Sequence, residues 1–143
     1  MALLEKVLEE KILQSIKEAE LKTSGEIRLH IDKICEGDPV LIAQNWFYQL
    51  GMDKTDLQNG VLFYLALESR KFSVIGDKGI DAKVPDDFWK KIIDDMAPLL
   101  KENKLVDAMA LGIKRTGEAL SQYFPYQLDD INELSDEISY GEE

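Results

Sequence analysis

Residues 59–67 (NGVLFYLAL) and residues 72–81 (FSVIGDKGID) decide the fold of this chain. The first run is too apolar for a half-exposed strand and too short to cross a membrane, so we expect a strand inside a covered sheet. Its odd-numbered residues 61–65 would fill one face and its even-numbered residues 62–66 the other. Only residues 68–71 (ESRK) separate the two runs, which predicts an antiparallel hairpin.

Periodicity in the rest of the chain predicts four helices and one more strand. Apolar residues recur at helical spacing over about 3–22, 39–50, 85–100 and 105–123. Residues 26–32 (EIRLHID) alternate apolar and polar side chains, which predicts a strand near a sheet edge with one solvent-exposed face. A strand, a helix and a second strand in succession imply a parallel pair. We therefore expect a single-domain α/β fold around a small mixed sheet, with an added N-terminal helix.

Negative charge is concentrated at the C-terminus. The 143-residue chain has a net charge of -11, and residues 125–143 contain seven acids and no Lys or Arg. We expect residues 1–124 to form the domain and residues 125–143 to form an acidic tail. The apolar residues between 128 and 138 should dock this tail on the body, near the third or fourth helix. An acidic protein repels phosphate backbones and anionic lipid, which argues against nucleic acid and membrane partners and for cations or a basic protein.

The N-terminal residues predict a soluble, cytoplasmic protein. Charged side chains begin at Glu5, no apolar run would serve as a signal peptide, and no segment is long enough to span a bilayer. Cys35 is the only cysteine, which excludes an intrachain disulfide.

Four short motifs, in this order and spacing, resemble the TPM-domain family over about residues 20–124. The motifs are residues 23–27 (TSGEI), residues 59–62 (NGVL), Gly76-x-x-Gly79-Ile80, and residues 84–86 (VPD). The resemblance implies an α/β/α sandwich around a small mixed sheet. It also implies a weak phosphatase activity, because a thylakoid-lumen relative linked to photosystem II repair is described as an acid phosphatase. This chain resembles a soluble bacterial-type member and has Gln58 where many relatives have an acid.

Carboxylates gather at the open end of the predicted hairpin. A turn at Ser69-Arg70 pairs residues whose numbers sum to 139, so that Gly60 would face Gly79. The loop before residue 60 and the segment after residue 76 would then lie side by side. The candidate metal ligands in these segments are Asp56, Asp77, Asp81 and Asp86, with Asp53 and Glu26 as additional ligands.

Calcium suits this set of side chains, because it takes about 6–8 oxygen ligands in flexible geometry. Magnesium is the second choice, and zinc or copper would require His or Cys nearby. The structural alternative is that these acids are turn formers and helix-start residues, as Asp77 and Asp86 would be. His30 shares a strand face with Glu26, Arg28 and Asp32, which fits either an acid-base row or a solvated face. We assign no catalytic residue.

Three functions remain open from the sequence. The first is binding of a divalent cation, calcium before magnesium, with a regulatory or interaction role. The second is a metal-assisted acid phosphatase, in which the cation would polarise a phosphoryl oxygen. The third is a metal-independent interaction module whose acidic tail binds a basic protein.

Overall fold

The computed structural model describes residues 5–126 and 138–141. Its elements are, in chain order, α1 (Lys6–Glu20), β1 (Glu26–Asp32), α2 (Pro39–Gln49), the short 3-10 helix η1 (Met52–Lys54), β2 (Gly60–Ala66), β3 (Lys71–Gly76), α3 (Lys78–Asp81), α4 (Phe88–Lys101), α5 (Leu105–Tyr123) and β4 (Ser139–Tyr140). The strands form one sheet of order β3-β2-β1-β4. β1 is parallel to β2 and β4, whereas β2 and β3 are antiparallel, so the sheet is mixed as predicted.

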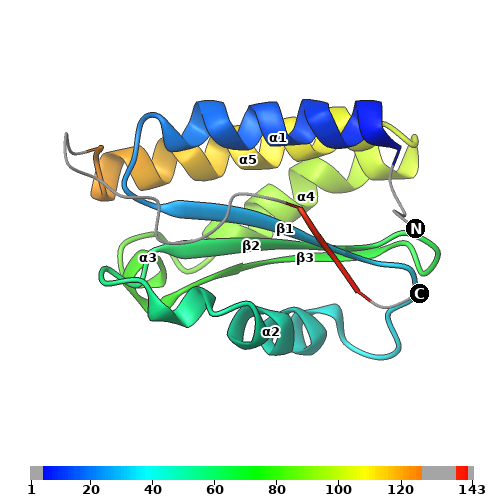
Figure 1. Ribbon diagram of the computed structural model, residues 1–143, viewed down its shortest axis with the longest axis horizontal. Helices are drawn as coiled ribbons and strands as arrows, with labels where there is room; N and C mark the ends of the chain where they lie inside the picture. The colour runs from blue at the N-terminus through cyan, green and yellow to red at the C-terminus, as the bar shows by residue number, and fades with distance from the viewer. Residues whose placement is uncertain (1–4, 127–137, 142–143) are drawn as a thin grey trace.

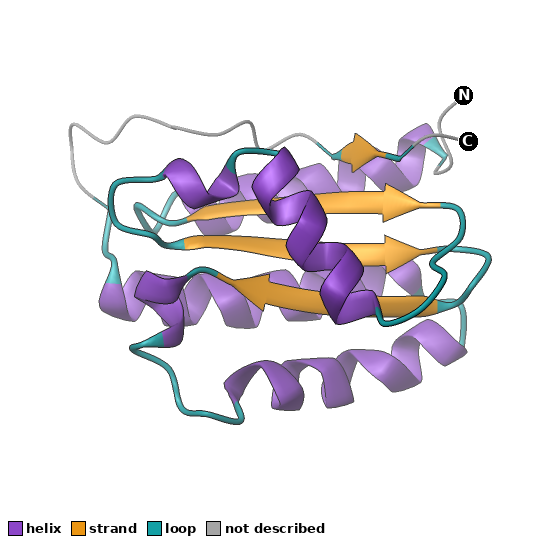
Figure 2. Ribbon diagram, turned by 90° about the horizontal axis from the view of Figure 1, so that it is seen from below, coloured by secondary structure: helices purple, strands orange, loops and turns teal. Residues whose placement is uncertain are grey.

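Helices cover both faces of this sheet (Figure 1). α1, α4 and α5 lie side by side on one face, and α2 lies on the other. Figure 2 shows α2 crossing the strands, with α3 at the end of the sheet where β1 and β2 begin. The predicted α/β/α sandwich with an added N-terminal helix is confirmed.

β2 is buried over its full length, which places it at the centre of the core. Val61, Phe63 and Leu65 pack in the larger apolar cluster beneath α1, α4 and α5. Leu62 packs on the other face with Phe47 and Met52. This division between odd and even residues agrees with the prediction of a strand that is covered on both faces and has no solvent-exposed side.

The hairpin register differs from the prediction by two residues. Val61 pairs with Gly76 and Ala66 with Lys71, so paired numbers sum to 137 and Gly60 does not face Gly79. A two-residue turn of the favoured type needs positive φ at both central residues, and only Arg70 of the expected pair adopts it, at φ 55. The loop therefore comprises residues 67–70. A shift of two leaves every side chain on its predicted face, because side chains alternate with a period of two.

The helix boundaries follow local capping chemistry. α2 begins where expected, with Asp38 accepting a hydrogen bond from the Val40 amide and Pro39 in the first turn. α5 covers the predicted range, whereas α4 begins at Phe88, three residues after Pro85. The sequence did not predict α3, whose single turn is capped by Asp77.

The predicted docking segment, residues 128–138, lies outside the described residues except for Ile138. Ile138 and Tyr140 pack against the main core, and β4 adds two residues to the edge of the sheet beside His30 and Ile31. β4 thus lies beside β1, and docking of residues 128–137 near the third or fourth helix stays a prediction. In the part of the chain that the structure describes, no helix has both the length and the apolar character to cross a membrane.

Candidate functional site

Two loops meet at the open end of the hairpin, where β1 and β2 begin and β3 ends. The Asp77 amide donates to the Gly60 carbonyl at 2.9 Å, and the Gly79 amide donates to the Gln58 carbonyl at 2.8 Å. A Cβ at residue 79 would collide with the Leu57 and Gln58 carbonyls, so only glycine permits this approach. The loop before β2 and the segment after β3 are therefore side by side despite the changed register.

Asp77 has one satisfied and one unsatisfied carboxylate oxygen. Its Oδ1 accepts from the Lys78 amide at 2.8 Å and caps α3. Its Oδ2 is buried without a hydrogen-bond partner, and the whole residue is only 9% exposed. Burial of an unpaired polar group costs about 1–3 kcal/mol, and more for a charged one, so this oxygen requires an explanation.

Asp53 presents a second buried oxygen in the facing loop. Its Oδ1 also has no hydrogen-bond partner, and neither does the side-chain nitrogen Nδ2 of the buried Asn59. The backbone carbonyl oxygen of Met52, the residue before Asp53, lies 3.3 Å from the position that a Gly60 Cβ would take. Asp53 and Asp77 thus flank the first residue of β2 from two different loops. Asn59, the first residue of the apolar run 59–67, is 2% exposed.

Asp81 ends α3 and interacts with Asp77. Its Oδ1 accepts from the indole nitrogen of Trp89 at 2.6 Å. Burial raises the pKa of Asp81, and the negative charge of Asp77 raises it further, although the Trp89 hydrogen bond opposes both effects. The two carboxylates are therefore close enough to repel each other.

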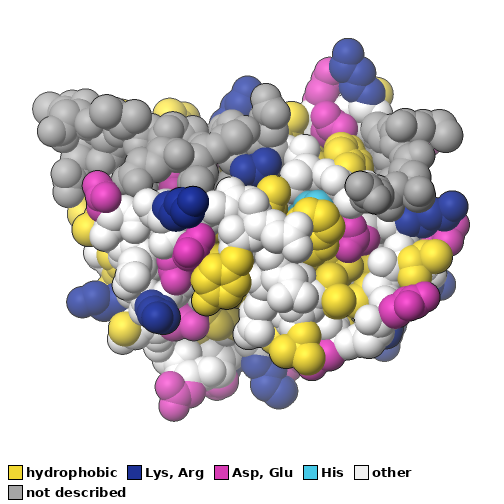
Figure 3. Space-filling model, turned by 60° about the horizontal axis from the view of Figure 1, so that its bottom comes forward, with side chains coloured by type: hydrophobic (Ala, Val, Ile, Leu, Met, Phe, Trp, Pro, Cys, Tyr) yellow, Lys and Arg dark blue, Asp and Glu magenta, His cyan; other side chains and the backbone are white. Residues whose placement is uncertain are grey.

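The other predicted ligands lie around this group. Asp56 is exposed in the loop before β2, and Asp86 is exposed in the turn before α4. Glu26 is 5% exposed and is opposite Gly60 in the parallel register. On the left of Figure 3, where this end of the molecule lies, acidic side chains alternate with Lys and Arg.

The described residues contain no group of three or more His, Cys, Asp or Glu placed to hold a metal ion. The ligand set of Asp56, Asp77, Asp81 and Asp86 therefore remains a prediction. A cation held by Asp53 and Asp77 would need backbone carbonyls or water for its other ligands.

A second polar group, the Asp32 cluster, lies at the opposite end of β1 and comprises Asp32, His30, Trp46, Tyr64 and Ser139. Asp32 Oδ2 accepts from the Tyr64 hydroxyl at 2.7 Å and from the Trp46 indole at 3.2 Å. Asp32 Oδ1 is 3.1 Å from His30 Nε2, and His30 Nδ1 is 2.7 Å from the Ser139 hydroxyl. The His30 ring stacks on Trp46 with centroids 3.9 Å apart.

This arrangement corrects the prediction of a solvent-exposed face on the first strand. His30 is 0% exposed and Glu26 is 5% exposed. Trp46 from α2 covers the His30 ring, and the backbone of Gly141 packs against the Asp32 carboxylate, so this face lies under a helix and the end of the tail. No part of the sequence pattern indicated that residues more than 100 positions later would cover this strand.

Comparison with known proteins identifies the family. The family model described as TPM domain matches residues 1–119. The chain belongs to the TPM-domain family. It is similar to the BA42 protein of the psychrophilic bacterium Bizionia argentinensis, at 42% identity over 98% of this chain and 97% of that one, with a TM-score of 0.89.

Two further solved structures share the fold of this TPM domain at low identity. The N-terminal domain of a protein from P. gingivalis is 19% identical, covering 86% of this chain and 80% of that one, with a TM-score of 0.66. The N-terminal domain of the cg2496 protein from Corynebacterium glutamicum is 13% identical, covering 99% and 82%, with a TM-score of 0.64. Comparison with curated proteins gives no significant match.

The buried histidine should make the stability of this TPM domain depend on pH. Burial lowers the pKa of His30 below its ordinary value of 6.5 and Arg28 lowers it further, although Asp32 opposes both. At a pH between the two pKa values, His30 is thus neutral in the folded protein but protonated in the unfolded chain. Its contribution to stability is present above pH 6.5 and is lost as the pH falls from there toward the lower pKa of the folded state.

Urea denaturation between about pH 7 and pH 5 measures this effect, because His30 is the one histidine of the chain. The wild type should lose stability on acidification, and His30→Gln should lose less, since its amide can still donate to Asp32 but does not titrate. Equal slopes for the two proteins would contradict the assignment to His30.

Proposed function

We propose that this TPM domain binds a divalent cation, calcium in preference to magnesium, at the open end of its hairpin, with a regulatory or interaction role. The observation that carries the proposal is the pair of buried carboxylate oxygens, Asp53 Oδ1 and Asp77 Oδ2, that have no hydrogen-bond partner. Buried charged oxygens are normally paired or bound to metal. A cation that contacts both oxygens would satisfy both.

The chemistry of the surrounding groups supports a hard cation. Carboxylate and carbonyl oxygens with water suit calcium, which accepts irregular geometry, whereas magnesium demands a near-ideal octahedron. Asp81 and the predicted ligands Asp56, Asp86 and Glu26 are the remaining acids of this end. The softer donors His30 and Cys35 lie elsewhere. His30 belongs to the Asp32 cluster, and the backbone amide of Cys35 donates a hydrogen bond to the Ser69 hydroxyl in the hairpin loop.

Electrostatics gives the cation a reason to bind. Burial and the negative charge of Asp77 raise the pKa of Asp81, so its ionised form is disfavoured. A bound divalent cation would favour the ionised form of Asp81. Its affinity should therefore weaken as the pH falls and Asp81 takes up a proton.

A metal-assisted phosphatase is the second candidate, because the matching family model carries phosphatase in its name. In that mechanism the cation would polarise a phosphoryl oxygen and a carboxylate would activate water. The nearby cations Lys54, Lys78 and Lys83 are all exposed, so a phosphate ester would find little preorganised positive charge beyond the ion. The third candidate, a basic protein bound by the acidic tail, depends largely on residues 127–137, which are outside the described residues.

Calcium should raise the melting temperature of the wild-type protein and should do so much less in Asp77→Asn. A ligand that binds only the native state stabilises it by about 2.7 kcal/mol at 100 times its dissociation constant. Asn is as good a helix cap as Asp, so Asp77→Asn should fold normally while losing a charged ligand. Thermal unfolding with increasing calcium, and separately with magnesium, measures the response.

Asp107→Asn is the matched control, because it removes one charge from an exposed residue in the first turn of α5. It should respond to calcium like the wild type. No calcium response at millimolar concentration, or an equal response in Asp77→Asn, would rule out the proposed site. Turnover of a phosphomonoester that disappears in Asp77→Asn would favour the phosphatase, whereas stabilisation without turnover would favour the binding function.

A further inference from the structure

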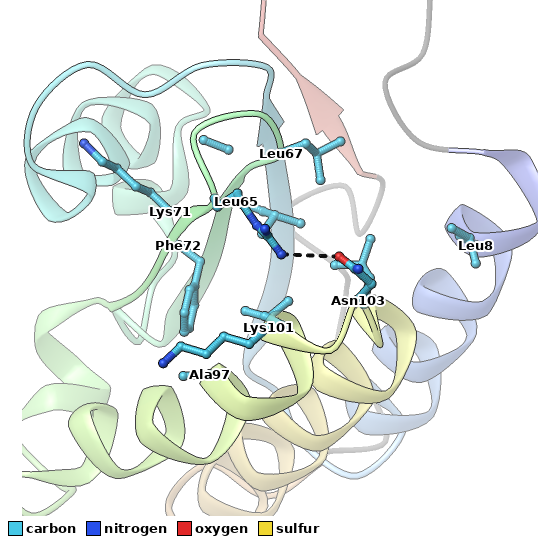
Figure 4. Close-up of a pocket in the computed structure, with 12 residues that line it drawn as sticks. Leu8, Leu65, Leu67, Lys71, Phe72, Ala97, Lys101 and Asn103 are labelled. Atoms are coloured by element: carbon cyan, nitrogen blue, oxygen red, sulfur yellow. Dashed lines mark hydrogen bonds between the residues drawn. The ribbon is translucent and has the colours of Figure 1, made fainter.

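A cavity lies at the other end of the sheet from the proposed cation site, between the hairpin loop and the ends of three helices. Its volume is about 370 Å³, within the range of small-molecule sites. Most of its wall is apolar and comes from α1, the hairpin, α4 and α5: Leu8, Leu65, Leu67, Phe72, Leu100 and Leu105. Figure 4 shows these elements around the cavity. An apolar chain would fit here better than a polar ligand.

Two exposed cations lie on the rim of this apolar cavity. The Arg70 guanidinium reaches across to Asn103, donating to its Oδ1 at 3.4 Å (Figure 4). Lys101 ends α4, and its side chain extends past Ala97 toward Phe72. Among the described residues, neither cation forms an ion pair with a carboxylate. In a chain of net charge -11, these two exposed cations beside an apolar cavity would attract an anion.

Lys71 also borders the cavity but is directed elsewhere. Its Nζ donates to the Gly37 carbonyl at 2.9 Å and to the Cys35 carbonyl at 3.4 Å, on the side of α2. Figure 4 accordingly shows its side chain ending away from the cavity. Arg70 and Lys101 are therefore the charges that a ligand in the cavity would meet.

The backbone at Arg70 adds an independent observation. Arg70 has φ 55, a left-handed conformation that glycine or asparagine adopts at lower cost. Asn103, its hydrogen-bond partner, has φ 60, but asparagine tolerates that conformation. Arginine is therefore an unfavourable choice for this turn, and the guanidinium that it places over the cavity gives a reason for its presence.

We propose that this cavity binds a fatty-acid carboxylate, with its alkyl chain among the leucines and its head group at Arg70 and Lys101. A neutral apolar ligand would leave the two cations without a role, and a small anion would leave the apolar wall exposed. Arginine suits a carboxylate because its planar guanidinium can donate two parallel hydrogen bonds. The site shares no residue with the proposed cation site, so each can fail without the other.

Decanoate, added to the full chain below its micelle concentration, is the test ligand. In 1H–15N spectra, the amides of residues 67–72 and 100–105 should shift with saturation. Acetate has the head group without the chain, and decyltrimethylammonium has the chain with the opposite charge, so neither should bind comparably. Absence of shifts with decanoate, shifts spread over other regions, or equal binding of either control compound would overturn the proposal.

Two variants separate the head-group and chain contacts. Arg70→Asn should weaken decanoate binding about tenfold, because it removes a charge-assisted hydrogen bond to the carboxylate. It should not lower stability, because asparagine tolerates the left-handed conformation of this turn. Ala97→Leu should block the cavity from the α4 side and abolish binding. Lys114→Gln, an exposed lysine on α5 outside the cavity, is the control and should bind like the wild type. Unchanged affinity in both Arg70→Asn and Ala97→Leu would contradict the proposed site.

Discussion

Phe63→Ala should destabilise the protein by about 3–5 kcal/mol, the usual cost of removing a buried aromatic ring from a core. Phe63 is 1% exposed in the central strand, where it lies between Leu29 of β1 and Val74 of β3. Its ring fills the space left by Gly112 of α5, whose missing Cβ would lie 3.0 Å from Phe63 Cε1. Urea denaturation should show a lower midpoint with an unchanged m-value.

The exposed aromatic residue Tyr48, which is 62% exposed on α2, provides the control. Tyr48→Ala should change stability by no more than about 0.5 kcal/mol. Gly112→Ala should destabilise the wild type, because its Cβ would meet both Phe63 and Met96, and should cost less when Phe63 is already alanine. A loss well below about 1 kcal/mol for Phe63→Ala would contradict the central position of this ring.

The sequence predicted those parts of the fold in which a short local pattern determines burial. Residues 61–66 are apolar without interruption, and only a strand covered on both faces explains this. Asp38-Pro39 fixed the start of α2, because its capping chemistry acts within three residues. The TPM-domain resemblance and the α/β/α architecture followed from such patterns and their order.

The register and the buried polar face could not be predicted in the same way. The register depended on the backbone conformation of Ser69 and Arg70, and neither residue type specifies a turn. Burial of His30 depended on Trp46 and on Ser139, which is 109 residues away. A pattern of alternating polar residues is the same whether water or a distant segment covers it.

The candidate cation site could also be predicted from the sequence only in part. Topology placed the loop before β2 beside the segment after β3, because both border the first residue of β2. Which oxygens lack hydrogen bonds depends on side-chain placement to a fraction of an ångström, and sequence spacing does not contain that information. The ligand set thus remains to be tested by the calcium response of Asp77→Asn.

Asp32→Ala should destabilise the protein by about 3–5 kcal/mol, as much as the loss of Phe63. The Asp32 carboxylate accepts hydrogen bonds from Tyr64 and Trp46 and, with His30 neutral, from His30 Nε2. His30 and Tyr64 are almost completely buried, so each of these donors would lose its acceptor within the core. Each buried donor left without a partner costs about 1–3 kcal/mol. Chemical denaturation at neutral pH measures the loss.

A double-mutant cycle with Tyr64→Phe distinguishes this network effect from simple loss of packing. Tyr64→Phe removes one of the three donors, so Asp32→Ala should cost less in that background, with a coupling energy of about 0.5–3 kcal/mol. Asp32→Asn should be intermediate, because its oxygen still accepts while its amide group opposes one of the donors. If the two losses are instead additive, Asp32 stabilises the fold without acting as the shared acceptor.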